Sequence, residues 1–263
     1  MTRLLAEMTW PDVERAVAAG ATTVLLPLGA TEQHGLHLPL GTDTVRAAAL
    51  AQRLAAAMPG ILVAPALPVG CSDEHSGFAG LLGLDHATLA RVIFDCGWRM
   101  AGWGVRRLLL LSAHGGNDQA LELARRRLQE RVPVLGVAIL PSSPALADAV
   151  AAIAARDGIS TAALGLHAGD GETSEMLHLR PDLVHRQRAA AGPSASLATM
   201  MPRLRQQGVR EVSPNGTLGD PREASAVRGE AYLAAQVASL ELELAALADD
   251  ESGAAETVPG DQR

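Results

Sequence analysis

Four side chains that can bind metal ions lie close together in the segment Leu26–Thr44. They are Glu32, His34, His37 and Asp43. Carboxylate oxygens and imidazole nitrogens are ligands that suit zinc, manganese and ferrous iron. Glycines and prolines interrupt the segment, which indicates a shaped loop, and in extended backbone alternate side chains point to the same side. We therefore expect this loop to supply half of a two-metal hydrolytic centre.

Two further clusters lie far from this loop in the sequence. His114 follows a short apolar run and precedes Gly115 and Gly116, which allow close approach of the backbone. The third cluster stands before an expected helix and contains His167, Asp170, Glu172 and Glu175. Structural roles are the alternative, since an aspartate before a helix can be an N-cap and acidic residues at a helix start offset the helix dipole.

The chemistry that such a centre would support is amide hydrolysis. Two divalent metals activate a water molecule for attack on an amide carbonyl. A nearby histidine or carboxylate then protonates the leaving nitrogen. One carboxylate must bridge the two cations, and Asp43 is the natural candidate because it is short and lies where the loop re-enters a helix.

The composition excludes several other functions. The net charge of −7 argues against a nucleic-acid binder, which needs a basic face. All 22 basic residues are arginine, so lysine Schiff-base chemistry and an ordinary P-loop are excluded. The two cysteines, Cys71 and Cys96, form no disulfide or zinc framework by spacing. Without a signal-peptide pattern, or an apolar run of the roughly 20 residues that span a membrane, we expect a cytoplasmic protein that binds no membrane.

The elements that must position these residues alternate between strands and helices. Short apolar strands are expected at residues 22–26, 61–64, 107–111 and 132–139. This alternation predicts an α/β fold with a mostly parallel sheet that is covered on both faces. Sites in such folds form at the carboxyl ends of strands, so the loops that carry the first two clusters should meet at one edge. We expect one domain over residues 1–248 and a disordered, acidic tail over residues 249–263.

Taken together, the motifs resemble the signature of the creatininase (creatinine amidohydrolase) family. The matching pieces are Glu32-Gln33-His34-Gly35, Asp43, His114-Gly115-Gly116-Asn117, His167-Ala168-Gly169, Glu172-Thr173-Ser174 and Leu218-Gly219-Asp220-Pro221. The resemblance implies a creatininase-like three-layer α/β sandwich and a site for two divalent metal ions, for which zinc, iron and manganese are all suitable. It also implies a closed homo-oligomer.

The resemblance further implies a role for each site residue. The expected metal ligands are Glu32, His34, Asp43, His114 and Glu172. Asp43 would bridge the two ions, with Glu32 and His114 on one of them and His34 and Glu172 on the other. The expected catalytic residues are His167, for proton transfer, and Glu172. Independently of the resemblance, we expect His75, Gly115, Gly116 and Asn117 to contact the substrate, and for the loop segment Asp73-Glu74-His75 we favour the substrate pocket or support of the metal ligands over direct metal binding.

The sequence departs from creatininase itself in ways that bear on the substrate. Creatininase carries a carboxylate where this chain has Gly116, so Glu172 would supply the missing ligand. Creatininase also places tryptophan near the third cluster, whereas aromatic residues make up only 2% of this chain. Both differences argue against creatinine as the substrate.

A second set of motifs favours a peptide substrate. The chain resembles, in several motifs, family members that remove a C-terminal Val-Tyr dipeptide from a modified ribosomal precursor peptide. These motifs are Glu74-His75, Met201-Pro202 and Gly208-Val209. We therefore expect a metal-dependent peptidase. The alternatives are a small-molecule amidohydrolase that acts on a creatinine-like ring or a formamide, and a non-catalytic protein whose metal site is structural.

Overall fold

The centre of the molecule is a four-stranded sheet in which every strand is parallel. The computed structural model describes residues 2–141, 144–193 and 197–256. The strands are β1 (Thr23–Leu28), β2 (Ile61–Val63), β3 (Arg107–Ser112) and β4 (Gly136–Leu140), in the spatial order β2-β1-β3-β4. The central strands β1 and β3 are buried on both faces, which explains why they are continuous apolar runs. The prediction of an α/β fold with a parallel sheet is confirmed.

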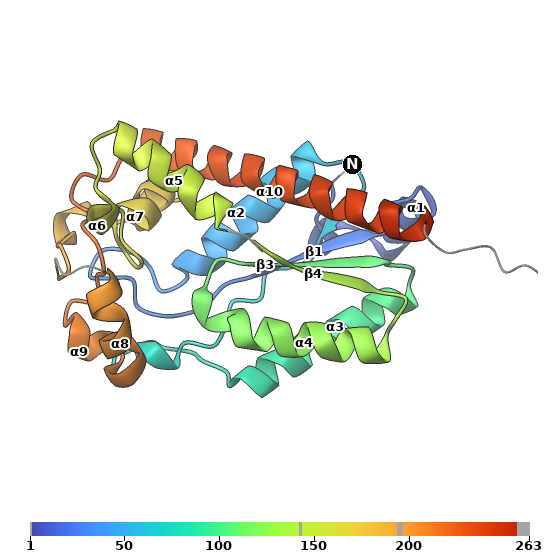
Figure 1. Cartoon of the computed structure of the whole chain (residues 1–263), viewed down its shortest axis with the longest axis horizontal. Coiled ribbons are helices and arrows are strands. Elements are labelled where there is room, and N and C mark those ends of the chain that lie inside the picture. Colours follow the sequence, from blue (N-terminus) through green and yellow to red (C-terminus); the bar gives the residue numbers. More distant parts are fainter. Residues whose placement is uncertain (1, 142–143, 194–196, 257–263) are drawn as a thin grey trace, which may run out of the picture.

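Helices α3 (His86–Gly102) and α4 (Asp118–Arg131) cover one face of the sheet (Figure 1). Leu26 of β1 and Leu108 of β3 point to this face and pack against apolar side chains of both helices. Alternate residues of a strand point to opposite faces, so the neighbouring leucines of β1 and β3 are left for the other layer.

Helices α2 (Thr42–Ala57), α5 (Ala145–Arg156) and α10 (Ala226–Glu256) lie on the opposite face (Figure 1). Leu25 and Leu109 pack there against Leu54 of α2 and Leu240 of α10. The three layers therefore enclose two separate apolar cores. Helix α1 (Trp10–Ala18) precedes β1 and begins with a capping box between Thr9 and Asp12.

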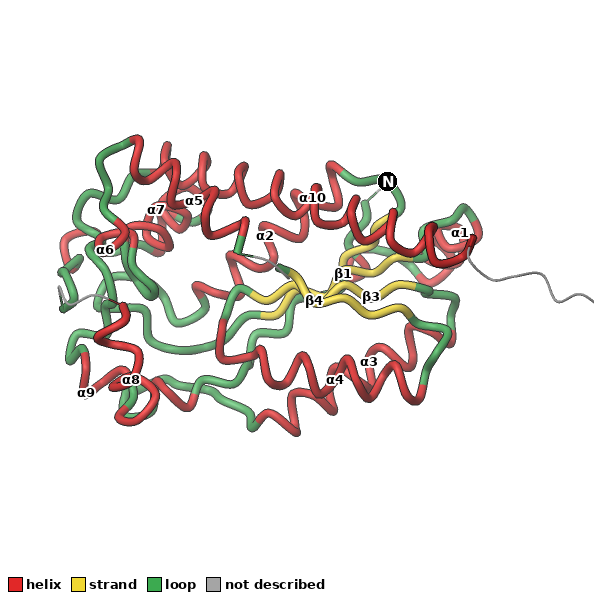
Figure 2. Tube along the Cα trace, in the orientation of Figure 1, coloured by secondary structure: helices red, strands yellow, loops and turns green. Residues whose placement is uncertain are grey.

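Long loops and short helices gather at one end of the molecule (Figure 2). The short helices are α6 (Thr161–Leu164), α7 (Asp170–Leu179), α8 (Leu197–Gln207) and α9 (Val209–Val212). Single 3-10 turns occur at Leu5–Glu7, Asp73–His75, Gly115–Asn117, Pro181–Leu183 and Arg186–Arg188. The loops that follow β1 and β3 run into this region, so it contains the carboxyl ends of the strands.

The structure corrects the sequence-based elements at three places. The strand expected at residues 132–139 begins only at Gly136, because the preceding residues form a turn in which the Leu135 N–H donates to the Val132 carbonyl over 2.9 Å. Helices α8 and α9 were not expected, since Pro202 interrupts the helical pattern of α8 and α9 is only four residues long. Helix α10 extends to Glu256, beyond the expected boundary at residue 248, and the rest of the expected tail lies outside the described residues. Within the described chain, no helix combines the length and the apolar character that spanning a membrane requires.

Candidate metal centre

The three clusters of the sequence converge beyond the carboxyl ends of β1 and β3. Glu32 and His34 lie in the loop after β1, Asp43 is in the first turn of α2, His114 follows β3, and Glu172 is in the first turn of α7. Glu32 and His34 are 0% exposed and Asp43 is 2% exposed. Burying carboxylates this completely is costly unless cations or hydrogen-bond donors compensate them.

The donor atoms form two overlapping groups. Glu32, Asp43 and His114 each offer one ligand atom within 4.8 Å of the others, and so do His34, Asp43 and Glu172. Asp43 belongs to both groups, as a bridging ligand would. A third group contains Glu32, His34 and His167.

The histidines are oriented for metal binding through one ring nitrogen. His34 Nδ1 lies 3.1 Å from the carbonyl oxygen of Glu32, and His114 Nε2 lies 2.8 Å from that of Cys71. His167 Nε2 lies 2.6 Å from the Gln33 carbonyl. When these nitrogens donate, the other ring nitrogen of each histidine presents its lone pair to the carboxylates. Hydrogen bonds of this kind fix the tautomer of metal-binding histidines.

The carboxylates have unused oxygens. Among the described residues, both oxygens of Glu32 and Oδ2 of Asp43 are buried without a hydrogen-bond partner. Buried polar atoms are otherwise almost always paired. Glu32 belongs to one of the two donor groups that share Asp43, and Asp43 belongs to both. The residues present therefore fit a pair of divalent cations.

The protonation states reflect the crowding of charges. Burial raises the pKa of Glu32 to about 7, and the neighbouring Asp43 carboxylate adds to this effect. Burial opposes protonation of His34, but the Asp43 and Glu172 carboxylates outweigh it and raise its pKa to about 9. Burial opposes ionisation of Asp43, yet His34 lies 3.1 Å away and the pKa of Asp43 is lowered well below its usual range. The metal-free centre therefore holds protons at neutral pH that a metal ion must displace.

We expect the affinity for metal ions to rise with pH. Glu32, His34 and His114 must each lose a proton, since the Glu32 and Asp43 carboxylates outweigh burial and raise the pKa of His114 as well. Binding should therefore strengthen by more than about two decades per pH unit near pH 6 and less steeply, by at least about one decade per unit, near pH 8. Calorimetric titration with Mn²⁺ in two buffers of different ionisation enthalpy measures the protons released. More than about two protons should be released at pH 6, and fewer, but at least about one, at pH 8. An affinity that is flat between these pH values would contradict the assignment.

Arg46 holds Glu172 in place from α2. Its guanidinium donates to Glu172 Oε1 over 2.8 Å and to Glu175 Oε2 over 2.7 Å, and it lies 3.9 Å from Asp43. The other Glu172 oxygen accepts the N–H of Ala168 over 2.7 Å. Ala168 has a φ of 51°, a left-handed conformation that costs free energy for a non-glycine residue. Burial opposes ionisation of Glu172, but Arg46 outweighs it and lowers the pKa of the carboxylate, which suits a metal ligand.

Gln33 connects the surrounding histidines and was not expected from the sequence. Its Nε2 lies 3.0 Å from His75 Nδ1 and 3.2 Å from the Gly216 carbonyl. His75 Nε2 lies 3.0 Å from Glu32 Oε1, but the pair does not have the geometry of a hydrogen bond. Burial lowers the pKa of His75 to about 2, so this histidine is neutral. His37 lies apart, since its Nε2 contacts Thr173 Oγ1 at 2.8 Å.

The residues after β3 differ in what they contact. Gly115 has open space around it and lines a cavity. A Cβ on Gly116 would lie 2.1 Å from the Cys71 carbonyl oxygen, so no side chain fits there. Asn117 is buried, and its amide accepts from the Cys71 N–H and donates to the Gly29 carbonyl. Asn117 therefore ties two loops together and does not line the cavity.

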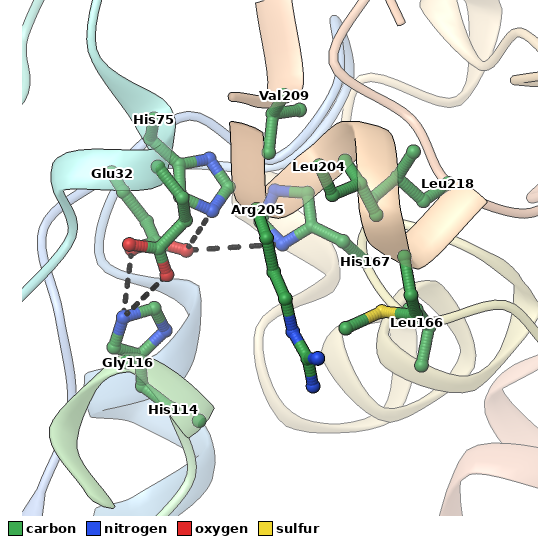
Figure 3. Close-up of a pocket in the computed structure, with 13 residues that line it drawn as sticks. Glu32, His75, His114, Gly116, Leu166, His167, Leu204, Arg205, Val209 and Leu218 are labelled. Carbon is green, nitrogen blue, oxygen red and sulfur yellow. Dashed lines mark ion pairs between the residues drawn. The ribbon is translucent and has the colours of Figure 1, made fainter. Parts of the chain in front are cut away.

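A cavity of about 400 Å³ opens beside Glu32 and His114 (Figure 3). Its opposite wall is mainly apolar and comes from the loops before α7 and α10 and from α8 and α9. The wall residues are Leu166, Met201, Leu204, Arg205, Val209 and Leu218. The donor groups thus lie on one side of a space large enough for a small ligand, and an apolar surface faces them.

The comparisons with known proteins agree with this geometry. The family model for creatininase (creatinine amidohydrolase) matches residues 6–243. Creatininase structures superpose with a TM-score of 0.74 at 31% identity, covering 91% of this chain and 95% of theirs, and a form described as "Creatininase Mn" gives 0.75 at 29% identity, covering 91% and 96%. The chain therefore belongs to the creatininase family of hydrolases.

Within the family the chain is similar to two kinds of enzyme. Mycofactocin precursor peptide peptidase from Mycobacterium ulcerans is 37% identical over 87% of this chain and 82% of its own length. The peptidase of the same name from Mycolicibacterium smegmatis is 39% identical over 81% of each chain. Creatinine amidohydrolase from Pseudomonas putida is 34% identical over 86% of this chain and 90% of its own length.

Proposed function

We propose that this protein is a binuclear metallopeptidase that removes the C-terminal Val-Tyr dipeptide from the modified mycofactocin precursor peptide. One observation carries the proposal: unpaired buried carboxylates and three oriented histidines meet on one side of a cavity whose other side is apolar. Carboxylate–imidazole sites suit zinc, manganese and iron. The similarity to two mycobacterial precursor peptide peptidases supports the choice of substrate.

From the donor groups we assign a set of ligands to each ion. Glu32 and His114 would hold one metal, His34 and Glu172 the other, and Asp43 would bridge them. When bound, the metals supply an activated water and polarise the scissile carbonyl. The water oxygen joins the carbonyl carbon, the C–N bond breaks, and the leaving nitrogen gains a proton.

His167 is suited to move that proton. Its Nδ1 faces the centre, 3.8 Å from Glu32 Oε1, because Nε2 is engaged with the Gln33 carbonyl. Burial lowers the pKa of His167 to about 4, and the charge of His34 adds to this effect, so the ring is neutral at pH 7. A neutral imidazole can accept a proton from the attacking water and pass it to the leaving amine. Glu172 is ionised and paired with Arg46. We therefore assign it to metal binding and not to proton transfer.

The substrate would enter through the cavity. Gly115 and His75 line it on the side of the donor groups, and the apolar residues of α8 and α9 line the other side. The side chains of a Val-Tyr segment are apolar and aromatic, and burial of each against this wall would contribute about 1.5–3 kcal/mol of binding free energy. A closed structural metal site would have no such cavity beside its ligands.

Removing the metal ions should abolish cleavage of the peptide. Protein treated with a chelator and freed of it by gel filtration should leave the modified precursor intact, since the metals supply several kcal/mol of the catalysis. Adding back Zn²⁺ or Mn²⁺ should restore a product that has lost the Val-Tyr mass. Mass spectrometry of the peptide and metal analysis of the protein provide the two readouts.

Assays of the same metal-loaded protein with other substrates distinguish the proposed peptidase from the two alternative functions. A small-molecule amidohydrolase would open creatinine or a formamide and leave the peptide unchanged, and the 34% identity to the Pseudomonas putida enzyme is the observation in its favour. A non-catalytic protein would bind metal and cleave neither substrate. Ring opening without peptide cleavage would overturn the proposed function.

A further inference from the structure

Glu74 is a carboxylate next to the centre that the set of expected ligands does not include. It lies in the 3-10 turn Asp73–His75, and Glu74 Oε1 is 3.5 Å from His114 Nε2. On the other side of the same ring, His114 Nδ1 is 3.5 Å from Asp43 Oδ2. The imidazole therefore lies between two carboxylates, one buried and one at the edge of the cavity.

The Nε2 side of His114 faces two carboxylates from other loops, Glu32 at 3.3 Å and Glu74 at 3.5 Å. A side chain at Gly116 is impossible there, because its Cβ would lie 2.4 Å from His114 Nε2 and 2.9 Å from Glu74 Oε1. Glu74 thus reaches, from a different loop, the space that a residue at this position would occupy. Within the described residues, the His114 contact is the only ion pair of Glu74, so no arginine competes for its charge.

The unpaired Glu32 carboxylate indicates that a cation belongs beside this ring, between Glu32 and Asp43. Glu32 is 0% exposed, and its Oε2, which lacks a hydrogen-bond partner among the described residues, is 3.3 Å from His114 Nε2. Glu32 and Asp43 would be compensated by the metal, whereas Glu74, with its side chain 37% exposed, is free to act on the imidazole.

We propose that Glu74 positions His114 for the Glu32–Asp43–His114 half of the metal centre. The Nε2 proton of His114 is held by the Cys71 carbonyl and faces the Glu74 carboxylate, so Nδ1 stays directed at Asp43 and would be available to a metal ion. A carboxylate behind a metal-binding histidine orients the ring and strengthens the ligand, and its loss typically weakens metal binding 10–100-fold. The inference rests on the proposed function, since it requires the two-metal centre.

The test compares Glu74→Gln with Asp73→Asn, which removes the same charge from the exposed neighbouring residue. Competition for Zn²⁺ with a chromophoric chelator measures both sites of the metal-free protein. Glu74→Gln should weaken one of the two sites by about 10–100-fold and leave the other unchanged, whereas Asp73→Asn should change neither by more than about threefold. Glu74→Asp keeps the charge and should retain most of the affinity. Urea unfolding of the metal-free variants should match that of the original protein.

The outcomes separate this proposal from the function on which it rests. Two tight sites in Glu74→Gln, or equal weakening in Glu74→Gln and Asp73→Asn, would overturn the positioning role and leave the metallopeptidase in place. A large loss of stability in metal-free Glu74→Gln that accounts for the weaker binding would also overturn it. A protein that binds no Zn²⁺ in any variant would overturn the proposed function itself.

Discussion

Replacing Asp43 with asparagine is expected to empty both halves of the metal centre and to lower peptide cleavage by about a thousandfold or more. Asp43 is the one residue shared by the two principal donor groups, and its Oδ2 is buried without a partner among the described residues. The amide of asparagine has nearly the same shape but cannot balance the charge of two cations. Metal analysis after gel filtration and a peptide-cleavage assay provide the measurements.

A surface aspartate provides the control for this variant. Asp182→Asn removes an exposed partner of Arg180, where an ion pair contributes about 0–1 kcal/mol, and should leave metal content and activity unchanged. His34→Ala should also abolish activity while the protein stays folded, because neither apolar core contains this residue. Two bound metals per chain in Asp43→Asn would show that the bridge is assigned to the wrong residue.

The second large effect is expected at Arg46, and it concerns stability. This arginine is only 13% exposed, and it compensates Glu172, Glu175 and Asp43 at once. Breaking a buried ion pair by removing one partner costs about 3–5 kcal/mol, because the remaining charges stay buried without compensation. Arg46→Met should therefore lose about this much unfolding free energy in the metal-free protein, as measured by urea denaturation.

The matched control lies two turns further along the same helix. Arg53 pairs with Glu230 at 2.6 Å, but both side chains are substantially exposed, so Arg53→Met should cost about 0–1 kcal/mol. Metal binding should weaken only in the Arg46 variant, since Glu172 loses the partner that orients it. A loss below about 1 kcal/mol in Arg46→Met would indicate that the carboxylates are compensated in another way.

Much of the fold could be predicted from the order of the elements. Apolar segments of strand length alternate with helical segments, and such a pattern is satisfied by a parallel sheet with a helical layer on each face. The core that each leucine of β3 enters could not be predicted. A strand that is buried on both faces is apolar throughout, so its sequence shows no alternation of polar and apolar residues. Helix α8 was missed for a related reason, since Pro202 conceals a segment that is stabilised by its own small apolar cluster.

The sequence by itself determined the chemical character of the site. Its motifs identified the carboxylates and histidines of the site. The loops after β1 and β3 had to meet because neighbouring parallel strands end at a common edge of the sheet. The spacing also indicates a role for Arg46, because this residue lies three positions after Asp43 and so on the same face of the helix.

Only the tertiary structure decided how these groups act together. Glu172 lies more than a hundred residues from His34, and no local pattern reports that α7 places it 3.8 Å from that imidazole. The tautomer of each histidine depends on a backbone carbonyl of another segment or of a folded loop, and Glu74 approaches His114 from a separate loop. Protonation states follow from burial and from charges that packing brings together. Local spacing can therefore identify metal-binding residue types, whereas their convergence, orientation and charge are properties of the packed chain.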